Sequence, residues 1–135
     1  MYEIEAKDIK KSFGNLEVLK SISLQVNKGE VVAILGSSGS GKSTFLRSLI
    51  DLETVDGGSI AIAGESLCKD GVYVSKKEKA KALSKAGMVF QHFNLFPHMS
   101  IRKNLMCAPL LNKQGTKEEI SKLAESTLAK VGLLD

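Results

Sequence analysis

Tryptophan is absent from this chain of 135 residues, which also has only two cysteines, two prolines and 5% aromatic residues. Cys68 and Cys107 form no C-x-x-C pair. We therefore expect reduced cytosolic thiols rather than a disulfide or a metal site. No apolar run approaches the ~20 residues of a membrane-spanning helix. The N-terminus has neither a basic start nor an apolar signal segment, so we do not expect export.

Hydrophobic residues make up 43% and charged residues 25% of the chain, which is typical of a soluble globular protein with one modest core. The net charge of +4 owes much to a cluster of lysines: Lys76, Lys77, Lys79, Lys81 and Lys85. No aromatic residues are interleaved with these lysines for stacking on bases. The pattern favours a solvated basic helix face over nucleic-acid binding, and we expect no nucleic-acid partner.

Residues 36–44, here called the phosphate loop, read G-S-S-G-S-G-K-S-T. This fits the Walker A pattern of two glycines five positions apart followed by Lys and Ser/Thr. The glycines let the backbone turn its N–H groups inward, and a helix beginning near Lys42 adds a positive dipole end. Lys42 supplies a charge for the terminal phosphates, and the Ser43 hydroxyl can bind Mg²⁺. The predicted nucleotide-binding residues are Gly36, Ser37, Ser38, Gly39, Ser40, Gly41, Lys42, Ser43 and Thr44.

The context of the phosphate loop supports this interpretation. The apolar run at residues 31–35 is typical of a parallel strand buried on both faces. The apolar residues Phe45, Leu46, Leu49 and Ile50 follow with the spacing of one helix face. The alternative, an ordinary Gly/Ser-rich turn, does not require a strand before it and a helix after it. We therefore expect nucleoside triphosphate binding.

The remaining pattern predicts short elements on both sides of the phosphate loop. We expect antiparallel strands over residues 2–7 and 18–26, a turn at 28–30, a turn at 56–58 and a strand at 59–63. Residues 65–74 suggest an exposed excursion, 75–85 a lysine-rich helix and 87–90 a second short apolar strand. Ser100 can cap a helix that Pro109 ends, and Thr116 begins a capping box whose helix stops at Gly132. An apolar stripe on this last helix comprises Ile120, Leu123, Ala124, Leu128 and Val131.

The phosphate loop alone would allow a kinase, a GTPase or a helicase. Four further segments narrow the choice: K-S-F-G at residues 11–14, V-L at 18–19, G-E-V-V at 29–32 and G-M-V-F-Q-H-F-N-L-F-P-H-M at 87–99. Together they resemble the nucleotide-binding subunits of ABC transporters, most closely those of bacterial polar amino-acid uptake. The resemblance covers essentially the whole chain, and the glutamine segment leaves little room for a kinase.

The resemblance implies roles for several residues. Phe13 matches the aromatic residue that stacks on adenine; taken alone, it could also be a core residue at a strand end. Gln91 matches the glutamine that reaches Mg²⁺ and the attacking water, so it is the expected catalytic residue and, with Ser43, a metal ligand. A patch for the partner's coupling helix could comprise Phe93, Leu95 and Phe96, unless these pack under the following helix. We expect His92 and His98 to be surface residues.

The implied fold is an α/β P-loop NTPase of ABC type, with a parallel core strand, an antiparallel β subdomain and the start of a helical subdomain. Residues 1–95 would form the nucleotide-binding core and β subdomain, and residues 96–135 the beginning of the helical subdomain. The L-S-G-G-Q signature, the metal-binding Asp, the catalytic Glu and the switch His do not occur in the sequence, which stops one short loop before the signature is expected. The family is an ATPase, but these residues alone lack the groups for hydrolysis.

The resemblance also implies ATP and Mg²⁺ as cofactors and a role in an importer that couples ATP hydrolysis to uptake of polar amino acids. The expected partners are transmembrane permease subunits, a second nucleotide-binding subunit arranged head to tail and, indirectly, an extracytoplasmic substrate-binding protein. The expected location is peripheral, on the cytoplasmic face of the inner membrane. The alternative is a truncated nucleotide-binding module without turnover.

Overall fold

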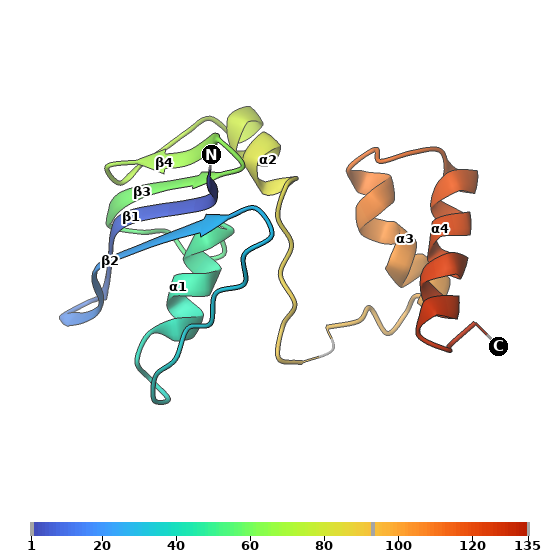
Figure 1. Ribbon diagram of the computed structural model, residues 1–135, viewed down its shortest axis with the longest axis horizontal. Helices are drawn as coiled ribbons and strands as arrows, with labels where there is room; N and C mark the ends of the chain where they lie inside the picture. The colour runs from blue at the N-terminus through green and yellow to red at the C-terminus, as the bar shows by residue number, and fades with distance from the viewer. Residues whose placement is uncertain (1, 93, 135) are drawn as a thin grey trace. The chain divides into compact units, whose positions relative to one another are not determined.

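The structure, a computed structural model, describes residues 2–92 and 94–134 and divides the chain into two compact units (Figure 1). The first unit is Met1–Met88 and the second is Val89–Asp135. The predicted boundary between residues 95 and 96, which divides the nucleotide-binding core and β subdomain from the helical subdomain, stays a prediction. None of the helices in the described ranges has the length and apolar character that crossing a membrane requires.

The first unit is built on a sheet of five strands in the order β2-β1-β3-β4-β5, with every pair antiparallel. The strands are β1 (Tyr2–Phe13), β2 (Leu16–Asn27), β3 (Gly57–Ile62), β4 (Glu65–Lys69) and β5 (Val72–Tyr73). Two helices accompany the sheet, α1 (Lys42–Leu49) and α2 (Lys76–Leu83). The predicted antiparallel pair at the N-terminus is confirmed, and both strands extend beyond the predicted residues. β1 pairs with β2 as far as Phe13, which lies opposite Leu16.

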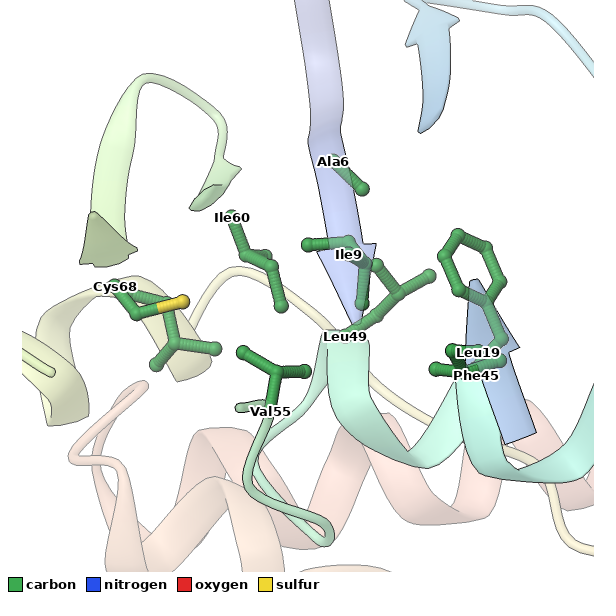
Figure 2. Close-up of a cluster of buried hydrophobic side chains, with 9 residues drawn as sticks. Ala6, Ile9, Leu19, Phe45, Leu49, Val55, Ile60 and Cys68 are labelled. Atoms are coloured by element: carbon green, nitrogen blue, oxygen red, sulfur yellow. The ribbon is translucent and has the colours of Figure 1, made fainter. Parts of the chain in front are cut away.

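The core of the first unit lies between α1 and one face of the sheet (Figure 2). Phe45 and Leu49, one turn apart on α1, are 4% and 6% exposed. They pack with Ile9 of β1 and Leu19 of β2, in one cluster with residues of β3 and β4. Burying a side chain of this size stabilises the fold by ~1.5–3 kcal/mol, so these contacts fix α1 against the hairpin.

The prediction of an exposed excursion at residues 65–74 is wrong. This segment forms β4 and β5, and Leu67 and Cys68 of β4 are fully buried. The two strands are joined by Asp70 and Gly71, whose φ angles of 48° and 81° are those of a tight hairpin turn. An Asp-Gly pair between short apolar runs is a hairpin signal, and it was present in the sequence. Both cysteines are free thiols, and burial raises the pKa of Cys68.

The predicted strands at residues 31–35 and 87–90 are also wrong, and with them the parallel core strand. Neither segment pairs with another strand in the part of the chain that the structure describes. Val31, Leu35 and Val89 are 94%, 90% and 97% exposed. A parallel strand buried on both faces needs a neighbouring strand on each side. In the described residues the five strands pair only with one another, so neither apolar run has such a neighbour there.

The predicted lysine-rich helix is confirmed as α2, which begins with a capping box between Ser75 and Glu78. Its basic side chains pair with acidic residues of neighbouring elements. Lys79 lies 3.1 Å from Asp51, and Lys81 lies 3.2 Å from Glu65. The hydrogen bond from Lys81 lowers the pKa of Glu65, and Lys85 adds to this effect. Part of the positive charge of α2 is therefore neutralised by ion pairs within the first unit.

The second unit contains α3 (Ile101–Leu111) and α4 (Lys117–Lys130). Ser100 caps α3 and Thr116 begins a capping box with Glu119, as predicted. The prediction that Pro109 ends this helix is wrong, because Pro109 lies inside α3, which continues to Leu111.

The apolar stripe of α4 is buried only in part. Ile120 and Ala124 pack with Met106 of α3. Leu123 and Val131, which belong to the same predicted stripe, are more than half exposed.

The titration of Tyr73 tests how its side chain is packed in the first unit. Its phenol oxygen accepts a hydrogen bond from the backbone N–H of Val55 at 2.8 Å, and burial raises its pKa from 10.0 to about 12. We expect its phenolate to appear only near pH 12 in the folded protein. Since the folded-state pKa is the higher one, the contribution to stability is complete below pH 10 and is lost as the pH rises through 12. Phenolate absorbance, compared with that of a Tyr73→Phe variant, measures this step, and a Tyr73 component titrating near pH 10 would contradict the assignment.

Candidate nucleotide-binding site

The phosphate loop leads directly into α1, as the sequence predicts. Gly39 and Gly41 have φ angles of 82° and 96°, a region that favours glycine. Within the loop, the backbone N–H of Ser40 donates to the carbonyl of Ser37 at 3.2 Å, which closes a tight turn. The loop is therefore curled by its own backbone.

At two glycines of the phosphate loop, Gly36 and Gly41, a side chain would approach neighbouring atoms closely. A Cβ at Gly41 would lie 3.0 Å from Cγ1 and 3.2 Å from the carbonyl oxygen of Val18 in β2. A Cβ at Gly36 would lie 2.7 Å from the Ser40 hydroxyl. The loop thus rests against the β1–β2 hairpin on one side and folds closely on itself on the other. A side chain at Gly41 would press on Val18, and one at Gly36 would displace the Ser40 hydroxyl.

The N-terminus of α1 has free donors and no negative charge. Gly41 is its N-cap and provides no side-chain hydrogen bond, and the first turn has no acidic residue. The first helical bond runs from the N–H of Phe45 to the carbonyl of Gly41 at 2.9 Å. The N–H groups of Lys42, Ser43 and Thr44 therefore have no acceptor within the helix. Such a terminus, at the positive end of the helix dipole, suits an anion.

Lys42 adds a full positive charge to these donors. Its ammonium group donates to the carbonyl oxygens of Gly36 and Ser37, with 2.8 Å between Nζ and the latter. Carbonyl oxygens hold the side chain in place without neutralising it. Among residues 2–92 and 94–134, no carboxylate oxygen lies within the 4.0 Å that defines an ion pair with this group. The loop therefore combines oriented amides with an uncompensated cation, an arrangement that fits a polyphosphate.

The predicted metal ligands lie in different units. Ser43 is exposed on the first turn of α1, where its hydroxyl is the kind of hard oxygen ligand that Mg²⁺ prefers. Gln91 is exposed in the second unit, so its role as a metal ligand and catalytic residue stays a prediction. In the described ranges, no group of three or more His, Cys, Asp or Glu side chains could hold a metal ion.

Phe13 lies at the end of β1 with its side chain outside the core. The residue is 46% exposed, which contradicts the alternative of a core phenylalanine; stacking on adenine stays a prediction. Phe13 pairs with Leu16 across the turn of the hairpin. The same hairpin supplies Val18 and Leu19, which line the space beside Gly41. One hairpin therefore carries both the exposed aromatic ring and a wall of the phosphate loop.

The proposed coupling patch belongs to the second unit. Leu95 and Phe96 are 63% and 48% exposed, and Phe93 lies outside the described residues. The Asn104 side chain holds the backbone of Phe96 through two hydrogen bonds, at 2.8 Å to its N–H and 3.2 Å to its carbonyl. This fixes the segment at the start of α3. His92 and His98 are exposed, as predicted.

Sequence reasoning missed the charged residues beside Phe13. Lys11 is almost fully buried, and its ammonium lies near Glu53 and Asp56. Strand alternation could have placed Lys11 on the face of Phe13. No spacing in the sequence connects β1 with residues 53–56, so the contact itself could not be found that way.

Comparison with known proteins places this geometry in a family. The family model described as "ABC transporter" matches residues 19–135. The arginine transport ATP-binding protein ArtM of Bacillus subtilis (strain 168) is 46% identical over 132 residues, which are 98% of this chain and 53% of that protein. The glutamine transport ATP-binding protein GlnQ of Escherichia coli (strain K12) is 44% identical over 134 residues, again 98% and 53%. The chain spans about half the length of these curated relatives.

A solved structure, the ATP-binding cassette MJ0796 in a dimeric post-hydrolysis state bound to ADP and Pi, has a TM-score of 0.77 at 29% identity. The match covers 93% of this chain and 56% of that chain. These findings confirm the resemblance and the fold class predicted from the sequence, apart from the parallel core strand, which is missing from the described residues.

Gly41 and Gly39 form a matched pair for testing the loop. Alanine at either position would have to adopt a left-handed backbone conformation, which costs ~1–2 kcal/mol. Only at Gly41 does the new methyl group also meet the backbone of Val18. We expect Gly41→Ala to lower the free energy of unfolding by about 1 kcal/mol more than Gly39→Ala. Urea unfolding of both variants measures this, and an equal loss would contradict the packing of the loop on β2.

Proposed function

Because this chain belongs to the ABC transporter family, we propose that it is the nucleotide-binding part of the ATP-binding subunit of an amino-acid importer and that its phosphate loop binds ATP. One observation carries the proposal: the curled loop, the uncapped N-terminus of α1 and the uncompensated Lys42 converge on one anion site. A triphosphate has the charge and the acceptors to satisfy all three. The other residues of the loop contribute backbone amides.

The residues beside the loop complete the proposed site. Phe13 stacks on the adenine base through its exposed ring, a contact that needs no base-specific hydrogen bond. Ser43 and Gln91 provide oxygen ligands for Mg²⁺, which neutralises phosphate charge when it is bound. Gln91 also orients the attacking water, since a neutral amide can accept from or donate to water without adding charge.

The proposed whole-protein activity follows from the relatives. ArtM and GlnQ are named for arginine and glutamine transport. We infer uptake of polar amino acids, driven by ATP hydrolysis at the cytoplasmic face of the inner membrane. The partners are permease subunits, reached through the segment around Leu95 and Phe96, and a second copy arranged head to tail. An extracytoplasmic substrate-binding protein delivers the amino acid to the permease and does not contact this chain.

A second candidate function is nucleotide binding without turnover by these 135 residues alone. It is favoured by the absence of an acidic metal-binding cluster from residues 2–92 and 94–134. It is also favoured by the sequence, which contains no L-S-G-G-Q signature. Phosphoryl transfer needs groups that hold the metal and position water as well as groups that bind the triphosphate.

Replacing Lys42 tests the proposed site. We expect Lys42→Ala to weaken binding of ATP–Mg by tenfold or more, because the substitution removes a charge-assisted interaction of ~1.5–3 kcal/mol. Lys28→Ala removes the same charge from an exposed turn of the first unit and should leave the affinity unchanged. Calorimetric titration of the parent and both variants measures the difference. Equal affinities of the parent and Lys42→Ala would refute the phosphate loop as the ATP site.

A measurement of turnover tests whether these 135 residues hydrolyse ATP by themselves. We expect steady-state phosphate release by the 135-residue chain to stay near background even when ATP is bound. General-base assistance is commonly worth ~10²–10⁴ in rate, and stabilisation of the transferring phosphoryl group adds a comparable factor. Turnover of ~1 s⁻¹ or faster, abolished by Lys42→Ala, would show that these residues suffice for hydrolysis.

A further inference from the structure

Lys11 is an unusual residue because a lysine side chain is rarely buried. It lies in β1 between Ile9 and Phe13, and its side chain is 11% exposed. Ile9 on the same strand face is fully buried, and Leu19, the β2 partner of Lys11, is 3% exposed. A charged group among such neighbours is costly unless it is paired. Its position therefore calls for partners that hold the ammonium in place.

The partners come from the segment that follows α1. The Lys11 ammonium lies 3.5 Å from Glu53 Oε1 and 3.9 Å from Asp56 Oδ1. We call these three residues the charge clamp.

Backbone hydrogen bonds hold the Asp56 part of the charge clamp in place. The other carboxylate oxygen of Asp56 accepts from the N–H of Ser12 at 2.7 Å, and the N–H of Asp56 donates to the carbonyl of Lys10 at 2.8 Å. Between the two acids, Val55 belongs to the buried core (Figure 2). These contacts thus join the end of β1 to the segment that follows α1.

The charge clamp reaches the exposed ring of Phe13. The Lys11 ammonium lies 5.1 Å from the centroid of this ring, within the range of a cation–π interaction. Residues two apart on a strand point to the same face, so the contact follows from the strand itself. With an ammonium against one face, the ring has its other face for a planar ligand, and the contact restricts how the ring can rotate.

We propose that Lys11, held by Glu53 and Asp56, is a positioning residue that orients the Phe13 ring for stacking on the nucleobase. The inference rests on the proposed function, since it takes the ligand of Phe13 to be the base of ATP. An ordered ring loses less rotational freedom when the base arrives, which raises affinity without a new contact to the nucleotide. Because the clamp joins β1 to the chain leaving α1, it also relates the base site to the helix that carries the phosphate loop.

The test compares ATP with a ligand that has a triphosphate chain but no nucleoside. Affinities for ATP and for inorganic tripolyphosphate, each with Mg²⁺, are measured by calorimetry on the parent chain and on Lys11→Met, which keeps the length of the side chain and removes its charge. We expect Lys11→Met to weaken ATP binding about three- to tenfold and to leave tripolyphosphate binding unchanged. Lys11→Arg retains the cation and should stay within about twofold of the parent for both ligands.

A double-mutant cycle tests whether Lys11 affects ATP binding through Phe13. In a Phe13→Ala background, Lys11→Met should cause no further loss of ATP affinity, because the ring that it orients is gone. Glu53→Gln, at a residue that is more exposed, gives a milder variant with the same expected selectivity if Lys11→Met does not fold.

Two outcomes would overturn the proposal: equal weakening of ATP and tripolyphosphate, or an undiminished loss of ATP affinity in the Phe13→Ala background. Failure of the proposed function has a different signature, because the parent would then bind neither ligand or Lys42→Ala would not affect binding.

Discussion

The burial of α1 against the β1–β2 hairpin is the contact on which the candidate site depends. Phe45 and Leu49 anchor the helix on Ile9 and Leu19, and this sets where the helix begins. Its N-cap then meets β2 so closely that a Cβ at position 41 would lie only 3.0 Å from Val18. The free amides and the Lys42 charge are oriented because the helix behind them is packed. An apolar contact thus positions a polar site, and the hairpin that makes it also presents the aromatic ring.

The sequence could predict those parts of the fold and the site whose causes are local. The phosphate loop, the start of α1, the first hairpin and the helix caps are encoded by glycines, capping residues and alternation within a few positions. The strand at residues 31–35 failed because a strand also needs neighbours, and local pattern cannot supply them. β4 and β5 were missed although Asp70-Gly71 marks their turn. The contact of Lys11 with Glu53 and Asp56 joins distant segments, so no motif could have revealed it.

The lysines of the first unit differ in what their ammonium groups contact. Lys79, Lys81 and Lys11 are matched with carboxylates, and they hold secondary-structure elements together. Lys42 is held by carbonyl oxygens instead, so its charge is still available to a ligand. A net charge of +4 reveals neither role. Other lysines also form no ion pair in the described part of the chain, so what distinguishes Lys42 is its position at the predicted phosphate loop.

The pairing of β1 with β3 affects the kinetics of folding. β1 pairs with β3 through contacts such as Ile4 with Ile62, and all of the phosphate loop and α1 lie in the chain between them. Folding must close this long loop before the sheet is complete, which makes its pairing a slow, entropically costly event compared with the local hairpins.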